Sequence, residues 1–465
     1  MGTFPAYALL EIFSFYISGV RLHGWQTLVH VCRRWRYVAL GSPRRLRLYL
    51  YCRPSTDQIP LQRTLDIWHP LPLVLDIASY PGLASRASGI ITALRHTDRI
   101  VGIILANIPP CMQKKTIAAM QEPLPKLMHL RMWSSGSSSM EPLPASFLGG
   151  SAPQLQSLSL SRVPYLALPK LLSSARDIVN ISVIMPDSGY ISSEDMAACL
   201  SSMKRLTKLT LNFEPRSERE PHSVTQRSSQ QERTVLHSLT HFHFGGAAKY
   251  LDDLVARIDA PRLSRVVVSF FKPIVSTDLS QFSQFIGQTD HFKLSNKADI
   301  VISEPTGYDV NLSIRVDETC TTHFDLRIPR TAGWEGTPAT LAQVCVNRTG
   351  SSRSSSLPIS TVEHLTIRGY RDCQPTWGNR WLEFLRVFAA VKNLHLCGDV
   401  AQHILPVLKD VTGEGTTEVL PALQNLFLLE YPPPPIRVQE AVIQEFTTVR
   451  RLAGLPVAVH VEKMW

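Results

Sequence analysis

The fold of this chain is constrained most strongly by a short apolar pattern that returns along most of its 465 residues. In each copy an apolar residue is followed by a second one three positions later and by a third one two positions after that. Such alternation is typical of a strand that buries one of its two sides. The ten copies are Ile100-Ile103-Leu105, Leu127-Leu130-Met132, Leu155-Leu158-Leu160, Ile178-Ile181-Val183, Leu206-Leu209-Leu211, Leu239-Phe242-Phe244, Leu263-Val266-Val268, Val362-Leu365-Ile367, Val391-Leu394-Leu396 and Leu423-Leu426-Leu428.

Within the two runs of copies, successive copies begin 23 to 33 residues apart, which leaves room for one strand and one helix per unit. The intervening segments agree, because residues 167–177, 192–203, 249–259 and 380–391 repeat apolar residues at the helical period. Ser192, with acidic residues soon after it, predicts a capped helix start. Strand-plus-helix units of this length are the layout of leucine-rich repeats. We therefore expect an α/β fold containing an irregular leucine-rich-repeat solenoid.

The repeats are interrupted between residues 271 and 360. Three stretches there, "HFKLSNKADIVIS", "YDVNLSIRV" and "HFDLRIP", alternate apolar and polar residues, which predicts antiparallel strands. We expect a small β-meander that is set into the sheet or extends it, followed by a helix over residues 337–346. Polar composition predicts loops at residues 134–139, 214–233 and 347–356, and the second of these has the composition of a disordered segment.

The first fifty residues show a different pattern. Residues 4–16 carry a helical apolar stripe, and residues 24–41 place Leu28, Val31, Cys32, Trp35 and Val38 on one side of a helix. The arginines at positions 33, 34 and 36 fall mostly on its other, solvated side. A few short helices in about 45 residues bury little surface by themselves, so we expect an apolar face that a partner or the adjoining repeats cover.

The stretches "FPAYALLEIFSF" and "LVHVCRRWRYVA" resemble the F-box, with Phe4 and Tyr7 as departures from its pattern. The resemblance implies docking on a Skp1-like adaptor, and through it on a cullin, in a ubiquitin ligase, and F-box modules followed by leucine-rich repeats are familiar as substrate receptors. The whole chain looks like the F-box-like families of mushroom-forming fungi. The implied docking residues are Phe4, Pro5, Leu9, Ile12, Phe13, Leu28, Val31, Cys32 and Trp35. A helical cap that only shields the end of the repeats is the alternative.

The chain is thereby divided into four parts. These are the F-box-like module (1–52), the first part of the solenoid (53–270), the β-meander with its loop (271–360) and the C-terminal part of the solenoid (361–465).

The repeat pattern also predicts which residues line the concave, open face of the sheet. The third and fifth positions of each copy point away from the buried leucines. Eight of these twenty positions are Lys, Arg or His and none is Asp or Glu, whereas 48 Lys+Arg and 15 His in 465 residues predict roughly three. The eight are His129, Arg131, Lys208, His241, His243, Arg265, His364 and His395. We expect this face to bind an acidic or phosphorylated client protein. Nucleic acid is a less favoured ligand, because few aromatic residues interleave with the basic ones, and a chance bias is the other interpretation.

Other features narrow the function classes. No G-x-S-x-G, P-loop, H-E-x-x-H or G-x-G-x-x-G motif occurs, so we expect neither an enzyme nor a cofactor. His241 and His243 could begin a metal site, but no third ligand is evident and no metal is expected. Eight scattered cysteines without a C-x-x-C pair favour reduced thiols in the cytoplasm or nucleus, and no apolar run is long enough to span a membrane.

The predicted function is a non-enzymatic substrate-recruiting subunit of a Skp1–cullin–F-box ligase. A repeat scaffold with a degenerate F-box, which binds a partner without ubiquitin transfer, is the alternative.

Overall fold

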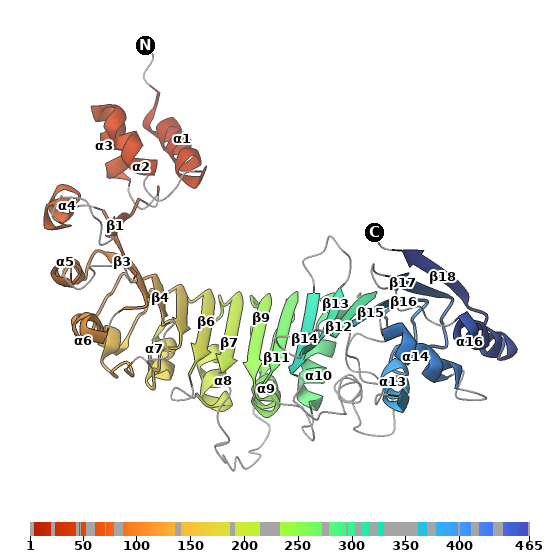
Figure 1. Ribbon diagram of the computed structural model, residues 1–465. Helices are drawn as coiled ribbons and strands as arrows, with labels where there is room; N and C mark the ends of the chain where they lie inside the picture. Colours follow the sequence, from red (N-terminus) through yellow and green to blue (C-terminus); the bar gives the residue numbers. More distant parts are fainter. Residues whose placement is uncertain are drawn as a thin grey trace. The chain divides into compact units, whose positions relative to one another are not determined.

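The computed structural model describes twenty segments of the chain, and two compact units, Met1–Ile191 and Ser192–Trp465, divide it. Each unit is of mixed α/β class with a mostly parallel sheet (Figure 1). The described residues are 4–19, 24–42, 46, 48–52, 61–69, 71–78, 87–108, 110–134, 141–186, 191–213, 233–271, 279–293, 296–302, 309–315, 323–329, 361–369, 378–398, 400–410, 418–430 and 440–463.

The first unit begins with three helices and continues into a parallel sheet. Its helices are α1 (Ala6–Gly19), α2 (Gly24–Val31), α3 (Arg33–Gly41), α4 (Leu61–Ile67), α5 (Ala87–Leu94), α6 (Pro110–Ala119) and α7 (Leu168–Ser174), with a 3₁₀ turn over Phe147–Gly150. Its strands are β1 (Leu50–Cys52), β2 (Leu73–Ala78), β3 (Ile100–Ala106), β4 (His129–Trp133), β5 (Ser157–Ser161) and β6 (Asn180–Met185). Each of these strands pairs in parallel with the next in the sequence.

The second unit repeats this arrangement over more strands. Its helices are α8 (Ser193–Ser201), α9 (Ala248–Val255), α10 (Ser280–Gly287), α11 (Asp290–Lys293), α13 (Gly378–Leu385), α14 (Val400–Lys409) and α16 (Glu440–Leu452). Its main strands are β7 (Lys208–Phe213), β9 (His241–Gly246), β11 (Arg265–Phe270), β12 (Lys297–Ile302), β13 (Asp309–Arg315), β14 (His323–Pro329), β15 (His364–Gly369), β16 (Asn393–Gly398), β17 (Asn425–Glu430) and β18 (Ala458–Lys463). Two short strands, β8 (Thr234–Val235) and β10 (Ile258–Asp259), pair separately.

All ten copies of the apolar pattern form strands in parallel pairing. The second and third apolar residues of each copy lie inside the strand and are buried, as Leu158 and Leu160 of β5 are, each 1% exposed. The first apolar residue is also buried; it lies two positions before the strand in nine copies, as Leu155 does, and Ile100 is itself the first residue of β3. The predicted alternation is therefore confirmed. It explains why the strands of successive copies of the pattern pair in register.

The predicted meander is set into the sheet of the second unit. Strands β12, β13 and β14 pair antiparallel with one another, and they lie between β11 and β15 in the order β11-β14-β13-β12-β15. The outer two pair in parallel with their repeat neighbours, so the sheet of this unit continues across the insertion. The helix predicted over 337–346 and the loop predicted over 347–356 lie outside the described residues, and so do the loops predicted over 134–139 and 214–233 apart from Ser134 and Arg233.

The predicted helices form, with shorter bounds. Ser192 caps α8, since its hydroxyl accepts a hydrogen bond from the Asp195 amide at 3.0 Å, as expected. The helix expected over 249–259 ends at Val255, because Ile258–Asp259 forms β10. The helix expected over 380–391 is α13, which ends at Leu385.

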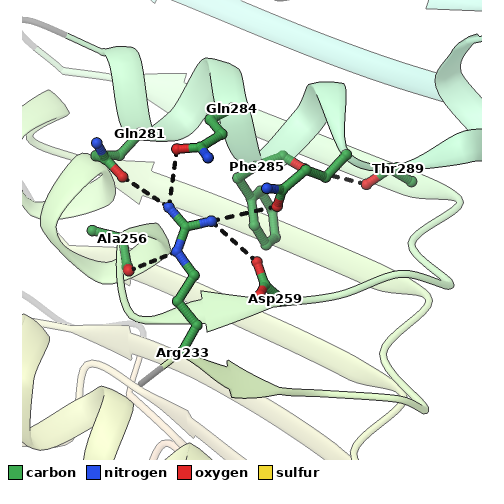
Figure 2. Close-up of polar contacts among 8 residues, drawn as sticks. Arg233, Ala256, Asp259, Gln281, Gln284, Phe285 and Thr289 are labelled. Atoms are coloured by element: carbon green, nitrogen blue, oxygen red, sulfur yellow. Dashed lines mark hydrogen bonds and ion pairs between the residues drawn. The ribbon is translucent and has the colours of Figure 1, made fainter. Parts of the chain in front are cut away.

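Arg233 fixes the entry into β8 (Figure 2). Its guanidinium donates to the side-chain oxygens of Gln281, Gln284 and Gln288 and to the carbonyl of Ala256, at 2.8 to 3.4 Å. It also forms an ion pair with Asp259 at 3.3 Å. One side chain therefore joins β10, α10 and the end of α9, which back the β9–β11 part of the sheet.

Candidate binding surfaces

The N-terminal module is a bundle of α1, α2 and α3 around a small apolar core. Leu9 and Phe13 of α1 and Leu28 of α2 are buried in it, and the Phe13 ring lies 4.9 Å from the ring of Trp35 on α3. Three of the predicted docking residues, Leu9, Phe13 and Leu28, therefore hold the helices together. They are not available to a partner.

The single helix predicted over 24–41 is wrong at its centre. Cys32 is extended (φ −158°, ψ 169°) and caps α3, since its Sγ accepts from the Trp35 amide at 3.4 Å. The change of direction between α2 and α3 explains why Val31 and Cys32 are exposed although Leu28 is buried. These residues do not share one apolar side, as the helical period had predicted.

The module exposes large apolar side chains. Of the predicted docking residues, Phe4, Pro5, Ile12, Val31 and Cys32 are exposed, and Trp35 is half-buried. Helix α1 has apolar residues on both sides, with Leu9 and Phe13 inside and Ile12 (46% exposed) and Phe15 (84%) outside. Large apolar side chains gathered on the exposed side of a helix mark a surface that is suited to a partner.

Sequence reasoning missed three exposed side chains in the same module. Tyr7 and Phe15 on α1 and Tyr37 on α3 are each at least two-thirds exposed. The signal was present for Phe15, since Ala8, Ile12 and Phe15 follow the helical period as a second stripe. We call Phe4, Tyr7, Ile12, Phe15, Val31 and Tyr37 the exposed apolar set.

Polar contacts tie the helices of the module to one another and to the rest of the unit. Arg34 donates to the carbonyl of Phe4, and Arg36 donates to the carbonyl of Val29 at 2.9 Å. Trp25 donates to the carbonyl of Tyr49 at 3.2 Å, and its ring lies 5.2 Å from that of Trp68. The arginines predicted to be only solvated thus tie the start of α1 to α3 and the end of α2 to α3, and Trp25 joins the module to the rest of its unit.

The basic positions predicted for the open face lie on strands of both units. His129 and Arg131 belong to β4 of the first unit, where Arg131 lies over the Trp133 ring at 4.7 Å from its centroid. Lys208, His241, His243, Arg265, His364 and His395 belong to strands of the second unit. Lys208 and Arg265 are exposed, and the four histidines are half-buried. A single basic face can therefore be described only within the second unit.

Strand register brings several of these residues to one level. Lys208 pairs with His241, His241 pairs with Arg265, and Lys297 of the meander pairs with His364. Between them, positions 323 and 315 of β14 and β13, which are His and Arg in the sequence, continue the same register. We call this level, from β7 to β15, the cation row. Lys297 was missed because the meander lacks the repeat pattern.

The next level of the same face is mixed in charge, which corrects the expectation of a face without carboxylates. It carries His243 and His395, and the meander adds Asp325 and Asp299. Buried Asp325 accepts from the Ser313 hydroxyl at 2.6 Å, and Asp299 is within 4.0 Å of Arg368. Both carboxylates thus have partners within the fold.

Two histidines on this level are held toward their neutral form. Partial burial, with Arg327 and Arg265 nearby, lowers the pKa of His243. Burial is also the main cause that lowers the pKa of His395, whose ring stacks on Phe427 with centroids 4.3 Å apart. Phe427 stacks in turn on His460 at 4.8 Å.

Hydrogen bonds orient the histidines of the cation row. The Thr240 hydroxyl donates to the carbonyl of Thr207 at 3.1 Å and lies 2.9 Å from Nδ1 of His241, so it can accept from that nitrogen. Asn425 donates to Asn393 at 2.8 Å, and Nδ2 of Asn393 lies 3.2 Å from Nδ1 of His364. Donation from Asn393 to Nδ1 places the proton of a neutral His364 ring on Nε2.

The described residues contain no group of three His, Cys, Asp or Glu side chains that could hold a metal ion. His241 and His243 therefore have no third ligand among these residues. Within the same residues, no helix has the length and apolar character needed to cross a bilayer. No protein-family model matches the sequence, and the search of curated proteins gave no match.

Proposed function

We propose that the chain is a non-enzymatic recruiting subunit of a Skp1–cullin–F-box type ubiquitin ligase. In this proposal the N-terminal module docks on a Skp1-like helical adaptor, and the strand face of the second unit binds a client protein. The strand-and-helix units would form a leucine-rich-repeat solenoid that carries the client face.

The observation that carries this proposal is the exposed apolar set on a module that resembles the F-box. Six large side chains stay open to solvent although the module has its own core around Phe13. Complete burial of one such side chain against a partner contributes about 1.5–3 kcal/mol. A few of them together are enough for a specific helix-on-helix interface.

The test is capture of a purified Skp1 homologue by the full chain. The double variant Ile12→Asp with Val31→Asp adds two charges at exposed positions, so we expect it to keep its circular dichroism and lose at least tenfold in affinity. Ile67→Asp is the matched control, because Ile67 of α4 is 60% exposed and lies outside the module. The proposal fails if the unaltered chain does not bind the homologue.

The alternative is a scaffold with a degenerate F-box that binds a partner without ubiquitin transfer. It is favoured if the exposed apolar set is needed for binding some other helical protein while the Skp1 homologue is not captured. Reconstitution with cullin and ubiquitin-conjugating enzyme then gives no client ubiquitination.

A further inference from the structure

Seven adjacent strands of the second unit carry a basic residue at one register level. The strands are paired without a break in the order β7, β9, β11, β14, β13, β12 and β15. The positions are Lys208, His241, Arg265, His323, Arg315, Lys297 and His364. Residues paired across neighbouring strands lie on the same side of a sheet, so the backbone places all seven positions on one face.

This face is opposite the helices. Phe242 of β9 and Phe324 of β14, at positions that alternate with the cation row, contact Phe285 and Phe282 of α10. Side chains alternate between the two faces of a strand, so the cation row points away from α10. The exposure of Lys208 and Arg265 agrees with this orientation.

The length of the cation row sets the length of a ligand that crosses it. Adjacent strands are about 4.8 Å apart, so the seven positions span roughly 29 Å. At about 3.3 Å per residue, an extended peptide of about nine residues covers that distance. An acidic segment of this length can therefore cross the whole row.

We propose that the cation row binds an extended acidic segment of a client protein, which crosses the strands from β7 to β15. This inference rests on the proposed function, because it specifies the chemistry of the client. The exposed side chains of Lys208 and Arg265 supply charge at one end of the row. Nε2 of His364 offers a hydrogen-bond donor beside Lys297.

The same face is less suited to nucleic acid. Single-stranded nucleic acid gains affinity by stacking its bases on aromatic rings. The Phe427 ring is already stacked between His395 and His460.

The test measures binding of fluorescein-labelled decaglutamate to the full chain by fluorescence anisotropy, with decaglutamine as the uncharged peptide. We expect decaglutamate to bind, decaglutamine not to bind, and the affinity to fall with added salt. The double variant Lys208→Glu with Arg265→Glu reverses two exposed charges of the row, and we expect at least a tenfold loss of affinity. Lys249→Glu with Arg451→Glu makes the same change in net charge at exposed residues of α9 and α16, and its affinity should stay within about twofold of the unaltered chain.

Three outcomes would overturn the inference. These are absence of decaglutamate binding, equal loss in both double variants, and tighter binding of a ten-nucleotide single strand at physiological ionic strength that depends on Lys208 and Arg265. Capture of the Skp1 homologue is measured on the same variants. The row variant should still capture the homologue, and Ile12→Asp with Val31→Asp should still bind decaglutamate, so failure of one proposal is distinguishable from failure of the other.

Discussion

At the residue scale, Arg233 shows how a single side chain can hold three elements together. Its side chain is 22% exposed, and its guanidinium contacts three glutamine side chains, one carbonyl and one carboxylate. A lysine has one nitrogen in place of three and lacks the planar fork, so it can reach only part of this set. The sequence does not indicate the role, since Gln281, Gln284 and Gln288 lie about fifty residues away.

We expect Arg233→Lys to lower the free energy of unfolding by about 1–2 kcal/mol, because hydrogen bonds from a charged donor are lost with their acceptors left in place. Denaturant unfolding of the full chain measures it. Arg262→Lys, at an exposed arginine of the same unit, is the matched control and should change stability by less than about 0.5 kcal/mol. Equal stability of the two variants would show that the cluster around Arg233 contributes nothing.

At the scale of elements, the helical period misled in one place. Leu28, Val31, Cys32 and Trp35 fit one helical side, yet the chain breaks between α2 and α3 at Cys32. Cysteine is not among the residues that usually cap helices, so the sequence signal for the break is weak. The consequence for the site is large, because the break turns Val31 and Cys32 outward.

Cap substitutions test this break. We expect Cys32→Ala to destabilise the module by about 0.5–1 kcal/mol, since the Trp35 amide loses its acceptor. Cys32→Ser keeps an acceptor of the preferred kind, and the thermal midpoint should equal or exceed that of the unaltered chain. If the serine variant is as unstable as the alanine variant, Cys32 does not act as a cap.

At the scale of the whole molecule, the strands were predictable where the chain repeats a unit. The spacing of apolar residues such as Leu158 and Leu160 predicts which side of the strand is buried. Every copy of the apolar pattern forms a strand in parallel pairing, as β5 does. β1, β2 and β18 were missed, because "LVLDIA" is nearly continuous in apolar residues and "AVHVEK" stands alone near the end. The three meander strands were predicted, but their place between β11 and β15 depends on pairings between distant segments that no local pattern contains.

Each candidate surface was predictable only in part, because a local residue pattern does not contain the packing of separate segments. The eight basic positions follow from the alternation within each repeat, whereas Lys297, Asp299 and Asp325 join that face only through the order of the meander strands. In the N-terminal module, short helices on a small core leave Phe15 outside and Phe13 inside. A pattern of apolar residues alone does not distinguish the two.

The sheet of the second unit ends in a strand with an exposed valine, which bears on how copies of the chain behave in solution. Among the described strands β18 pairs on one side only, with β17. Val461 of β18 is 55% exposed although its register partner Leu428 is buried, and Leu452 at the end of α16 is 83% exposed. The unpaired edge of a strand is a template on which another chain can pair, and an exposed apolar side chain beside it favours that contact. We therefore expect the chain to self-associate as its concentration rises, and Val461→Lys to reduce this at least severalfold with little change in thermal midpoint. Sedimentation velocity over a concentration series measures the effect.

Val235→Lys, at a 43% exposed valine of β8, is the control that should leave association unchanged. Association that is identical in both lysine variants and the unaltered chain would place the contact elsewhere than at β18.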